Sequence, residues 1–252
     1  MLVSDLMSSP VHGAFPGDTV SHARNLMIRH RISRILILDD GRATGIITKK
    51  DIGFRLRRKD PGWRFRQIDN ELLREVMSSD LVSVSPDTGV RDALMIMMTH
   101  KISGVPVIDQ GMVLGMFTRT DLLRSTLVQS LDLPVREKMH EPVLVAPGHS
   151  SVHVVDLIRN GAAAVVVADD SGLAGIITET DLAFYEEQPD TAGSGTAAGM
   201  MRSSVPSLPD TARTGEAVAS MQKNACQSVI ITGETGIVGI ITRDDIIREV
   251  AL

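Results

Sequence analysis

A threonine followed three residues later by an aspartate occurs four times in the chain, each time after a glycine and two apolar residues. The four pairs are Thr48 and Asp51, Thr118 and Asp121, Thr178 and Asp181, and Thr242 and Asp245. An aspartate carboxylate can accept hydrogen bonds from two neighbouring hydroxyl groups, and the N–H groups at a helix N-terminus attract phosphate. The same spacing also forms a capping box, which stabilises a helix without any ligand. The residues alone leave both interpretations open.

The four aspartates belong to a longer repeated pattern. A methionine precedes them by 44, 44, 42 and 44 residues, at Met7, Met77, Met139 and Met201 respectively. Chance does not preserve such spacing four times, so the sequence predicts four structural repeats.

Within each repeat the hydrophobic pattern predicts a helix, two strands and a second helix. In the second repeat, apolar residues recur at helical spacing at Val90, Ala93, Leu94, Met97 and Met98, and the methionines of this helix, Met95 included, are predicted to be core. Two apolar runs, 102–108 and 113–117, flank a turn and predict a β-hairpin. Residues after Thr118 predict the second helix, so the Thr-x-x-Asp element lies where a strand passes into a helix.

The composition is that of a globular protein, with 43% hydrophobic residues and a net charge of −5 over 252 residues. The negative charge argues against general affinity for nucleic acid, which depends on a basic surface. The longest apolar run, 162–168, is far short of the roughly 20 residues that span a bilayer, and the first residues lack the pattern of a signal peptide. With Cys226 as the single cysteine, these features favour a cytoplasmic location and an inert thiol.

One basic segment, 55–66, departs from the acidic average. Its charged and aromatic residues are Arg55, Arg57, Arg58, Lys59, Asp60, Trp63, Arg64, Phe65 and Arg66. We favour a solvated helix end and linker here; the alternatives are a docking patch for an acidic partner and a contact with nucleic acid.

The joins between repeats predict two pairs. Segments 52–76 and 122–138 are compatible with helices, whereas 190–196 is small, polar and glycine-rich and predicts a flexible connection. We therefore expect one module over residues 1–130, with repeats at 1–60 and 70–130. A second module is expected over 131–252, with repeats at 131–188 and 197–252.

The order of elements, the methionine start and the closing Gly-aliphatic-aliphatic-Thr-x-x-Asp resemble the CBS (cystathionine-β-synthase) domain family, and Ile102–Asp109 looks like its first-strand signature. The resemblance implies an α/β (α+β) fold, in which each repeat is a small sheet flanked by two helices and repeats pair into Bateman modules. It also implies a regulatory protein and not an enzyme, without a cofactor, whose clefts bind AMP, ADP, ATP or S-adenosylmethionine and which acts on a partner protein. A homodimer is left open.

The resemblance implies roles for particular residues. Ribose would contact Asp51, Asp121, Asp181 and Asp245. Phosphate would contact Thr48, Thr118, Thr178 and Thr242, the adjacent cations Lys49, Arg119 and Arg243, and Arg34 at the start of a strand, for which a solvent-facing arginine is the alternative. The adenine slot would involve Ile32, Ile35, Ile102, Val105 and Pro106, which could equally be core. Because Glu179 replaces the cation in the third repeat and Gly161–Ala164 offers little polarity, we expect a degenerate third site and the tighter sites in residues 1–130.

Other patterns in the chain do not support a catalytic or metal site. His149 and His153 are four residues apart with His140 nearby, but surface histidines are favoured over metal ligands. The glycine-rich stretch 233–239 matches the hairpin turn of the other repeats and is interpreted as a turn.

Overall fold

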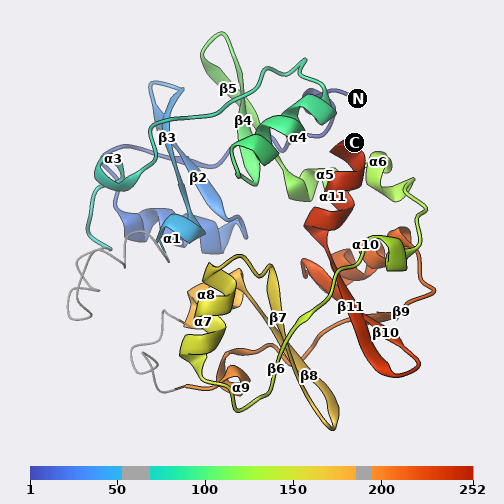
Figure 1. Ribbon diagram of the computed structural model, residues 1–252. Coiled ribbons are helices and arrows are strands. Elements are labelled where there is room, and N and C mark those ends of the chain that lie inside the picture. Colours follow the sequence, from blue (N-terminus) through green and yellow to red (C-terminus); the bar gives the residue numbers. More distant parts are fainter. Residues whose placement is uncertain (53–68, 186–194, 252) are drawn as a thin grey trace. The chain divides into compact units, whose positions relative to one another are not determined.

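The computed structural model describes residues 1–52, 69–185 and 195–251, and these fall into two compact units (Figure 1). Unit 1 contains Met1–Asp121 and unit 2 contains Leu122–Val250. Each unit therefore holds one pair of repeats. The basic segment 55–66 and most of the glycine-rich join at 190–196 lie outside the described residues.

The elements follow the predicted order of helix, strand, strand and helix in the second, third and fourth repeats, whereas most of the second helix predicted for the first repeat lies outside the described residues. Those of unit 1 are β1 (Gly13–Ala14), α1 (Val20–Arg29), β2 (Arg34–Asp39), β3 (Arg42–Thr48), α3 (Leu73–Val76), α4 (Val90–Thr99), β4 (Gly104–Asp109) and β5 (Met112–Thr118). Helix α5 (Arg119–Leu123) contains the boundary between the units. Those of unit 2 are α6 (Thr126–Gln129), β6 (Val143–Val145), α7 (Ser151–Arg159), β7 (Ala164–Asp169), β8 (Gly172–Thr178), α8 (Glu179–Tyr185), α9 (Ala197–Met200), β9 (Ser207–Pro209), α10 (Thr214–Lys223), β10 (Ser228–Gly233), β11 (Gly236–Thr242) and α11 (Arg243–Ala251).

The predicted hairpin is present in all four repeats, and its register is the same in each. In β4 and β5, Gly104 pairs with Thr118, and a bulge follows Val107. This register places the threonine at the end of the hairpin, opposite the residue that begins it. A short parallel strand also joins three of the hairpins, as β1, β6 and β9. The sequence did not predict these strands, because segments of two or three residues carry no periodic signal.

Helix α4 shows how closely the hydrophobic pattern predicted the core. Val90, Ala93, Leu94 and Met97 are buried as expected. The core assignment was wrong for two methionines, since Met98 is 39% exposed and Met95 is 51% exposed. Successive helical residues are about 100° apart, so Met98 already lies beyond the buried stripe that ends at Met97.

The segment that opens each repeat packs on the other repeat of its pair. We call these segments arms and define them as residues 2–8, 72–78, 134–140 and 196–202. In unit 1, the arm of the first repeat bonds to the second repeat through the backbone of Ser8 and Met116. The arm of the second repeat bonds back to the first through Ser78 and Ile46.

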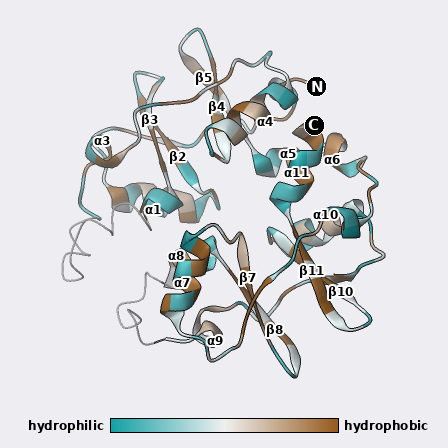
Figure 2. Ribbon diagram, in the orientation of Figure 1, coloured by the Kyte–Doolittle hydropathy of each residue, from teal (hydrophilic) through white to brown (hydrophobic). Residues whose placement is uncertain are grey.

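Unit 2 repeats this reciprocal exchange. His140 of the third arm bonds to Ile240 in β11, and Arg202 of the fourth arm bonds to Ile176 in β8. The two repeats also share one core, in which residues of β7 and β8 pack with Ile230 and Ile240. Figure 2 shows apolar residues in brown along the hairpin of β10 and β11. Each pair is thus a single packed body, with each repeat completed by an arm of the other.

A glycine within the second strand of each hairpin leaves space for the methionine of the paired arm. A Cβ atom at Gly115 would lie 2.5 Å from Sδ of Met7, and one at Gly239 would lie 2.4 Å from Sδ of Met139. The corresponding pairs are Gly45 with Met77 and Gly175 with Met201. This contact explains why the methionine and the glycine recur together in all four repeats.

Candidate functional site

In every repeat the threonine and the aspartate of the Thr-x-x-Asp element bind each other. The threonine donates from its backbone N and its Oγ1 to Oδ2 of the aspartate, at 2.9 and 2.7 Å in the pair Thr48 and Asp51. The same two bonds form in the other three repeats. The backbone N of Asp51 also donates to Oγ1 of Thr48 at 3.1 Å, which completes a capping box. The helix-cap interpretation is therefore satisfied by the geometry, and it engages one oxygen of each carboxylate.

A residue from the paired arm also reaches the aspartate. Oγ of Ser8 donates to Oδ1 of Asp121 at 2.7 Å, and Nε of Arg202 lies 2.7 Å from Oδ1 of Asp181. In the fourth repeat, Nδ1 of His140 lies 3.3 Å from Oδ2 of Asp245. All three arm residues directly follow the methionine that occupies the glycine space. The sequence interpretation missed them because they come from the other repeat of the pair.

The contact between His140 and Asp245 changes the pKa of both groups. The hydrogen bond to Asp245 raises the pKa of His140, although its partial burial opposes the shift. Burial alone would raise the pKa of Asp245, but hydrogen bonds from His140 and Thr242 outweigh it and lower that pKa. Both groups are therefore charged in the folded protein between the lowered pKa of Asp245 and the raised pKa of His140.

Replacing His140 by Gln is expected to destabilise the protein at pH 5.5 more than at pH 8.5. The charged histidine stabilises the fold fully below its unfolded pKa of about 6.5, and this contribution disappears as pH rises through the raised folded value. The side chain is 46% exposed, so we expect roughly 0.5 kcal/mol or less. Thermal unfolding of H140Q and wild type across this range measures the effect, with H153Q, an exposed histidine on α7, as control. A stability difference that stays constant with pH would contradict the assignment.

Two arginines predicted to bind phosphate in different repeats contact neighbouring residues just before β4. Nη2 of Arg34 donates to Oγ of Ser103 at 2.8 Å. Nη2 of Arg119 lies 3.4 Å from the carbonyl oxygen of Ile102. Gly104 makes room for the first of these side chains, since a Cβ atom there would lie 1.7 Å from Nη1 of Arg34. Arg34 thus reaches the second repeat, which the sequence alone did not show.

The three predicted cations that follow a threonine are held by a residue that directly precedes the first hairpin strand of their own repeat. Backbone N atoms of Lys49 and Arg243 donate to the carbonyl oxygens of Ser33 and Gln227, at 2.9 and 2.8 Å. Lys49 is exposed, whereas the side chain of Arg243 is only 15% exposed and its Nε lies 3.7 Å from Asp244. The predicted cations therefore share one backbone position but differ in access to solvent.

The residues predicted for an adenine slot divide by burial. Ile35 and Val105 are fully buried and Pro106 is buried, and Ile35 belongs to the core of the first repeat. Ile32 and Ile102 are partly exposed and precede β2 and β4. Ile32 and Ile102 therefore offer surface to a ligand in this structure, and the adenine slot stays a prediction.

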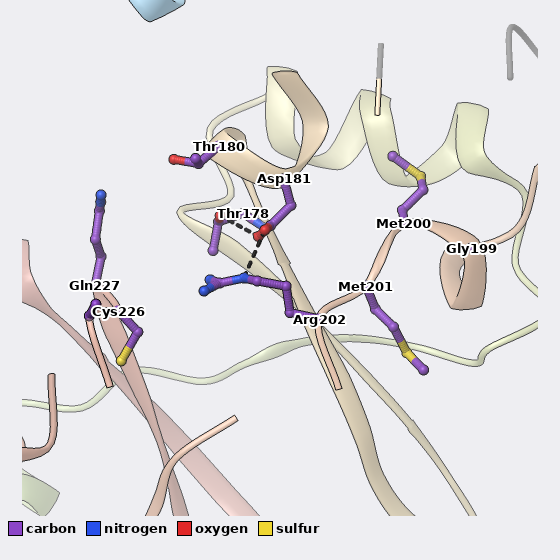
Figure 3. A pocket seen from close by; sticks show the side chains of 10 residues that line it. Thr178, Thr180, Asp181, Gly199, Met200, Met201, Arg202, Cys226 and Gln227 are labelled. Carbon is purple, nitrogen blue, oxygen red and sulfur yellow. Dashed lines mark hydrogen bonds and ion pairs between the residues drawn. The ribbon is translucent and has the colours of Figure 1, made fainter. Parts of the chain in front are cut away.

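A pocket of about 520 Å³ lies between the third and fourth repeats in unit 2 (Figure 3). Its lining residues are Thr178, Thr180, Asp181, Gly199, Met200, Met201, Arg202, Ala225, Cys226 and Gln227. Glu179, which lowered the expected rank of this repeat, is not among them. Arg202 supplies a cation that the sequence interpretation did not count. The expectation of tighter sites in residues 1–130 stays a prediction.

Cys226 lies in this pocket with its thiol partly buried. Burial raises the pKa of the thiol, and Sγ lies 3.3 Å from the carbonyl oxygen of Ser228. A raised pKa keeps the sulfur protonated at neutral pH, which lowers its reactivity as a nucleophile.

Within residues 1–52, 69–185 and 195–251, no three histidine, cysteine or acidic side chains gather as a set that could hold a metal ion. Nδ1 of His149 accepts a hydrogen bond from the backbone N of Ala146 at 2.8 Å, and its ring centroid is 5.6 Å from that of His153. None of the helices in the same ranges has the length and apolar character needed to cross a membrane.

Comparisons with known proteins give the same four-part division. The family model described as CBS domain matches residues 3–56, 73–127, 135–187 and 197–252. The crystal structure of protein MJ1225 from Methanocaldococcus jannaschii superimposes with a TM-score of 0.80, at 20% identity and with 99% of each chain covered. In sequence, MJ1225 is 24% identical over 181 residues, which are 66% of this chain and 65% of MJ1225.

Two curated relatives match about half of this chain. The CBS domain-containing protein YhcV of Bacillus subtilis (strain 168) is 30% identical over 120 residues, 48% of this chain and 81% of YhcV. Homoserine O-acetyltransferase of Methanohalophilus mahii is 33% identical over 122 residues, which are 47% of this chain but only 23% of that enzyme. The chain thus resembles a minor part of the enzyme.

Proposed function

Because the chain belongs to the CBS domain family, we propose that it is a regulatory sensor that binds adenine nucleotides or another adenosyl ligand at its Thr-x-x-Asp elements. The observation that carries the proposal is the contact between the aspartate of a repeat and an arm of the paired repeat, seen at Asp121, Asp181 and Asp245. A ribose that bound this carboxylate would compete with the arm for the same oxygen. Ligand binding at one repeat would then also change a contact made by the arm of the other repeat.

Such competition provides a route from binding to regulation. A ligand shifts a conformational equilibrium only if it binds one arrangement better than another. Ribose hydroxyls at Asp121 would favour an arrangement in which Ser8 has left Oδ1, and this change would move the first arm relative to β5. A partner protein that contacts the arms would then distinguish the ligand-bound form from the free form.

Calorimetric titration of the full chain tests the proposal directly. We expect saturable heat with at least one of AMP, ADP, ATP and S-adenosylmethionine, and a ligand-dependent rise in Tm, because binding to the folded state alone stabilises it. Guanosine diphosphate, which has the same ribose and phosphates, serves as the control for base selectivity. A folded sample that gives no heat and no Tm shift with any adenosyl ligand would contradict the proposal.

The second candidate function is a scaffold that binds no ligand. The complete capping box of Thr48 and Asp51 favours it, because this geometry accounts for the aspartate through helix stability alone. Under this alternative, the arms and aspartates only hold paired repeats together.

The proposal also covers the location of the protein, its partners and a role for the basic segment. A cytoplasmic location is consistent with a single cysteine, which cannot form an internal disulfide. The regulated partner is proposed to be a protein, and a homodimer is one arrangement for testing by sedimentation. A role for segment 55–66 in nucleic-acid binding rests on residues outside the described part of the chain, and a salt-dependent gel shift tests it.

A further inference from the structure

We infer that Arg202 makes the pocket of unit 2 select adenosyl ligands with an anionic 5′ group over those with a cationic sulfonium. The inference rests on the proposed function and names the class of ligand for one of its sites. It assigns a specificity role to a residue that follows Met201 in the fourth arm and lies outside the Thr-x-x-Asp elements.

The side chain of Arg202 is placed to serve the pocket as well as the fold. Its Nε engages Oδ1 of Asp181 at 2.7 Å, and the side chain is 43% exposed. Figure 3 shows the rest of the guanidinium extending away from Asp181, toward the wall formed by Cys226 and Gln227. A guanidinium carries five N–H donors in a planar fork that matches phosphate oxygens. The terminal donors are separate from Nε, so they can bind an anion even when a ribose has taken Oδ1 of Asp181 from Nε.

The charge balance of the lining residues leads to the same conclusion. Asp181 and Arg202 are the two charged residues among those that line the pocket, so their charges cancel. Without the arginine, the single carboxylate would repel phosphate and attract a sulfonium. With the arginine present, a positive group lies beside the Asp181 carboxylate, which is the group proposed to bind the ribose. A nucleotide therefore gains a charge-assisted hydrogen bond there, whereas a sulfonium meets a like charge.

The corresponding position in unit 1 has different chemistry. Ser8 contacts Asp121 at this position through a neutral hydroxyl, and Ser78 follows the methionine of the second arm. A serine satisfies one carboxylate oxygen without cancelling its charge. The residue after the arm methionine is thus neutral in unit 1, whereas Arg202 of unit 2 is positively charged. The preference for an anion is therefore assigned to the pocket that contains Arg202.

The single cysteine of the chain provides a local readout, because Cys226 lines this pocket. Ligand that enters the pocket should slow modification of the thiol by a maleimide, and the concentration at half-protection reports affinity at this site. In the wild-type chain, we expect ADP to protect at lower concentration than S-adenosylmethionine. In R202Q, the half-protecting concentration of ADP should rise about tenfold or more, while that of S-adenosylmethionine stays equal or falls.

Control variants separate the loss of this charge from other effects. R136Q removes an exposed arginine of unit 2 outside the pocket and should leave both concentrations unchanged. Circular dichroism checks the fold of R202Q, and R202M, which also lacks the charge, must show the same loss for ADP. An unchanged ratio of the two ligands in a folded R202Q or R202M would overturn the inference.

Calorimetry and Cys226 protection together distinguish failure of the Arg202 inference from failure of the proposed function. If calorimetry detects an adenosyl ligand but none protects Cys226, the proposed function stands and the role of Arg202 is refuted. If neither method detects any adenosyl ligand, the proposed function itself fails.

Discussion

Replacing Asp121 by Asn is expected to weaken adenosyl-ligand binding at the second repeat by roughly 100-fold. A ribose diol needs two acceptor atoms on one side chain, and Asn keeps only one oxygen. Hydrogen bonds to a charged group contribute about 1.5–3 kcal/mol each, so losing one such bond and the charge corresponds to about two orders of magnitude in Kd. The carboxylate of Asp121 is nearly buried, at 8% exposure, which limits compensation by water.

The same substitution separates a sensor from a scaffold. The D121N variant would also lose part of the capping box with Thr118 and the contact with Ser8, so a modest decrease in stability of about 1–2 kcal/mol is expected under either function. Calorimetry should show that the full chain loses a binding event only if it is a sensor. D109N, at an exposed turn of the same hairpin, is the matched control. Unaltered stoichiometry and affinity in a folded D121N would exclude a ribose contact at this residue.

Replacing Gly175 by Ala is expected to destabilise unit 2 by about 1–3 kcal/mol, or roughly 2–10 °C in Tm. The added Cβ atom would lie 2.7 Å from the carbonyl oxygen of Arg202 and 2.7 Å from Sδ of Met201. A methionine side chain can rotate away from such a clash, but the backbone of the arm is fixed by its hydrogen bonds to Ile176. The arm must therefore move away from β8, and its contacts are weakened.

Two other glycines provide controls for the same added methyl group. No atom lies within 4 Å of a Cβ built at Gly148, so G148A should leave Tm nearly unchanged. At Gly104 the added atom would lie 1.7 Å from Nη1 of Arg34 and 2.9 Å from Cγ2 of Thr118, so G104A should displace Arg34 from Ser103 and tests a methyl group that meets side chains only. Thermal unfolding of the three variants measures the difference. Equal Tm values for G175A and G148A would show that the fourth arm does not depend on this close approach.

Much of the fold could be predicted from the sequence because its signals are local. The helical spacing of Val90, Ala93, Leu94 and Met97 predicted α4, and the paired apolar runs predicted each hairpin. The Thr-x-x-Asp elements predicted the strand-to-helix transition at Asp51 and its counterparts. These features depend on residues within about ten positions of each other, where periodicity and turn chemistry decide the structure.

The arms and their residues at the site could not be predicted in this way. Ser8 reaches Asp121 across 113 positions, and no local pattern reports a contact at that distance. Arg202 was overlooked because the third repeat was judged on its own residues, including Glu179. The sequence did contain a signal in the residue that directly follows each of the four methionines. This residue is neutral in the first pair of repeats and basic in the second, as Ser8, Ser78, His140 and Arg202.

The exchange of arms also sets an order of events during synthesis. The second arm bonds to Ile46, which is already made when Ser78 leaves the ribosome, so the first repeat can be completed early. The first arm must wait for Met116, and at roughly 5–20 residues per second this delay is about 5–20 s. Through that interval the nascent chain holds residues 2–8 without their acceptor strand. The first arm of each pair can therefore bind only after most of the second repeat of that pair has been made.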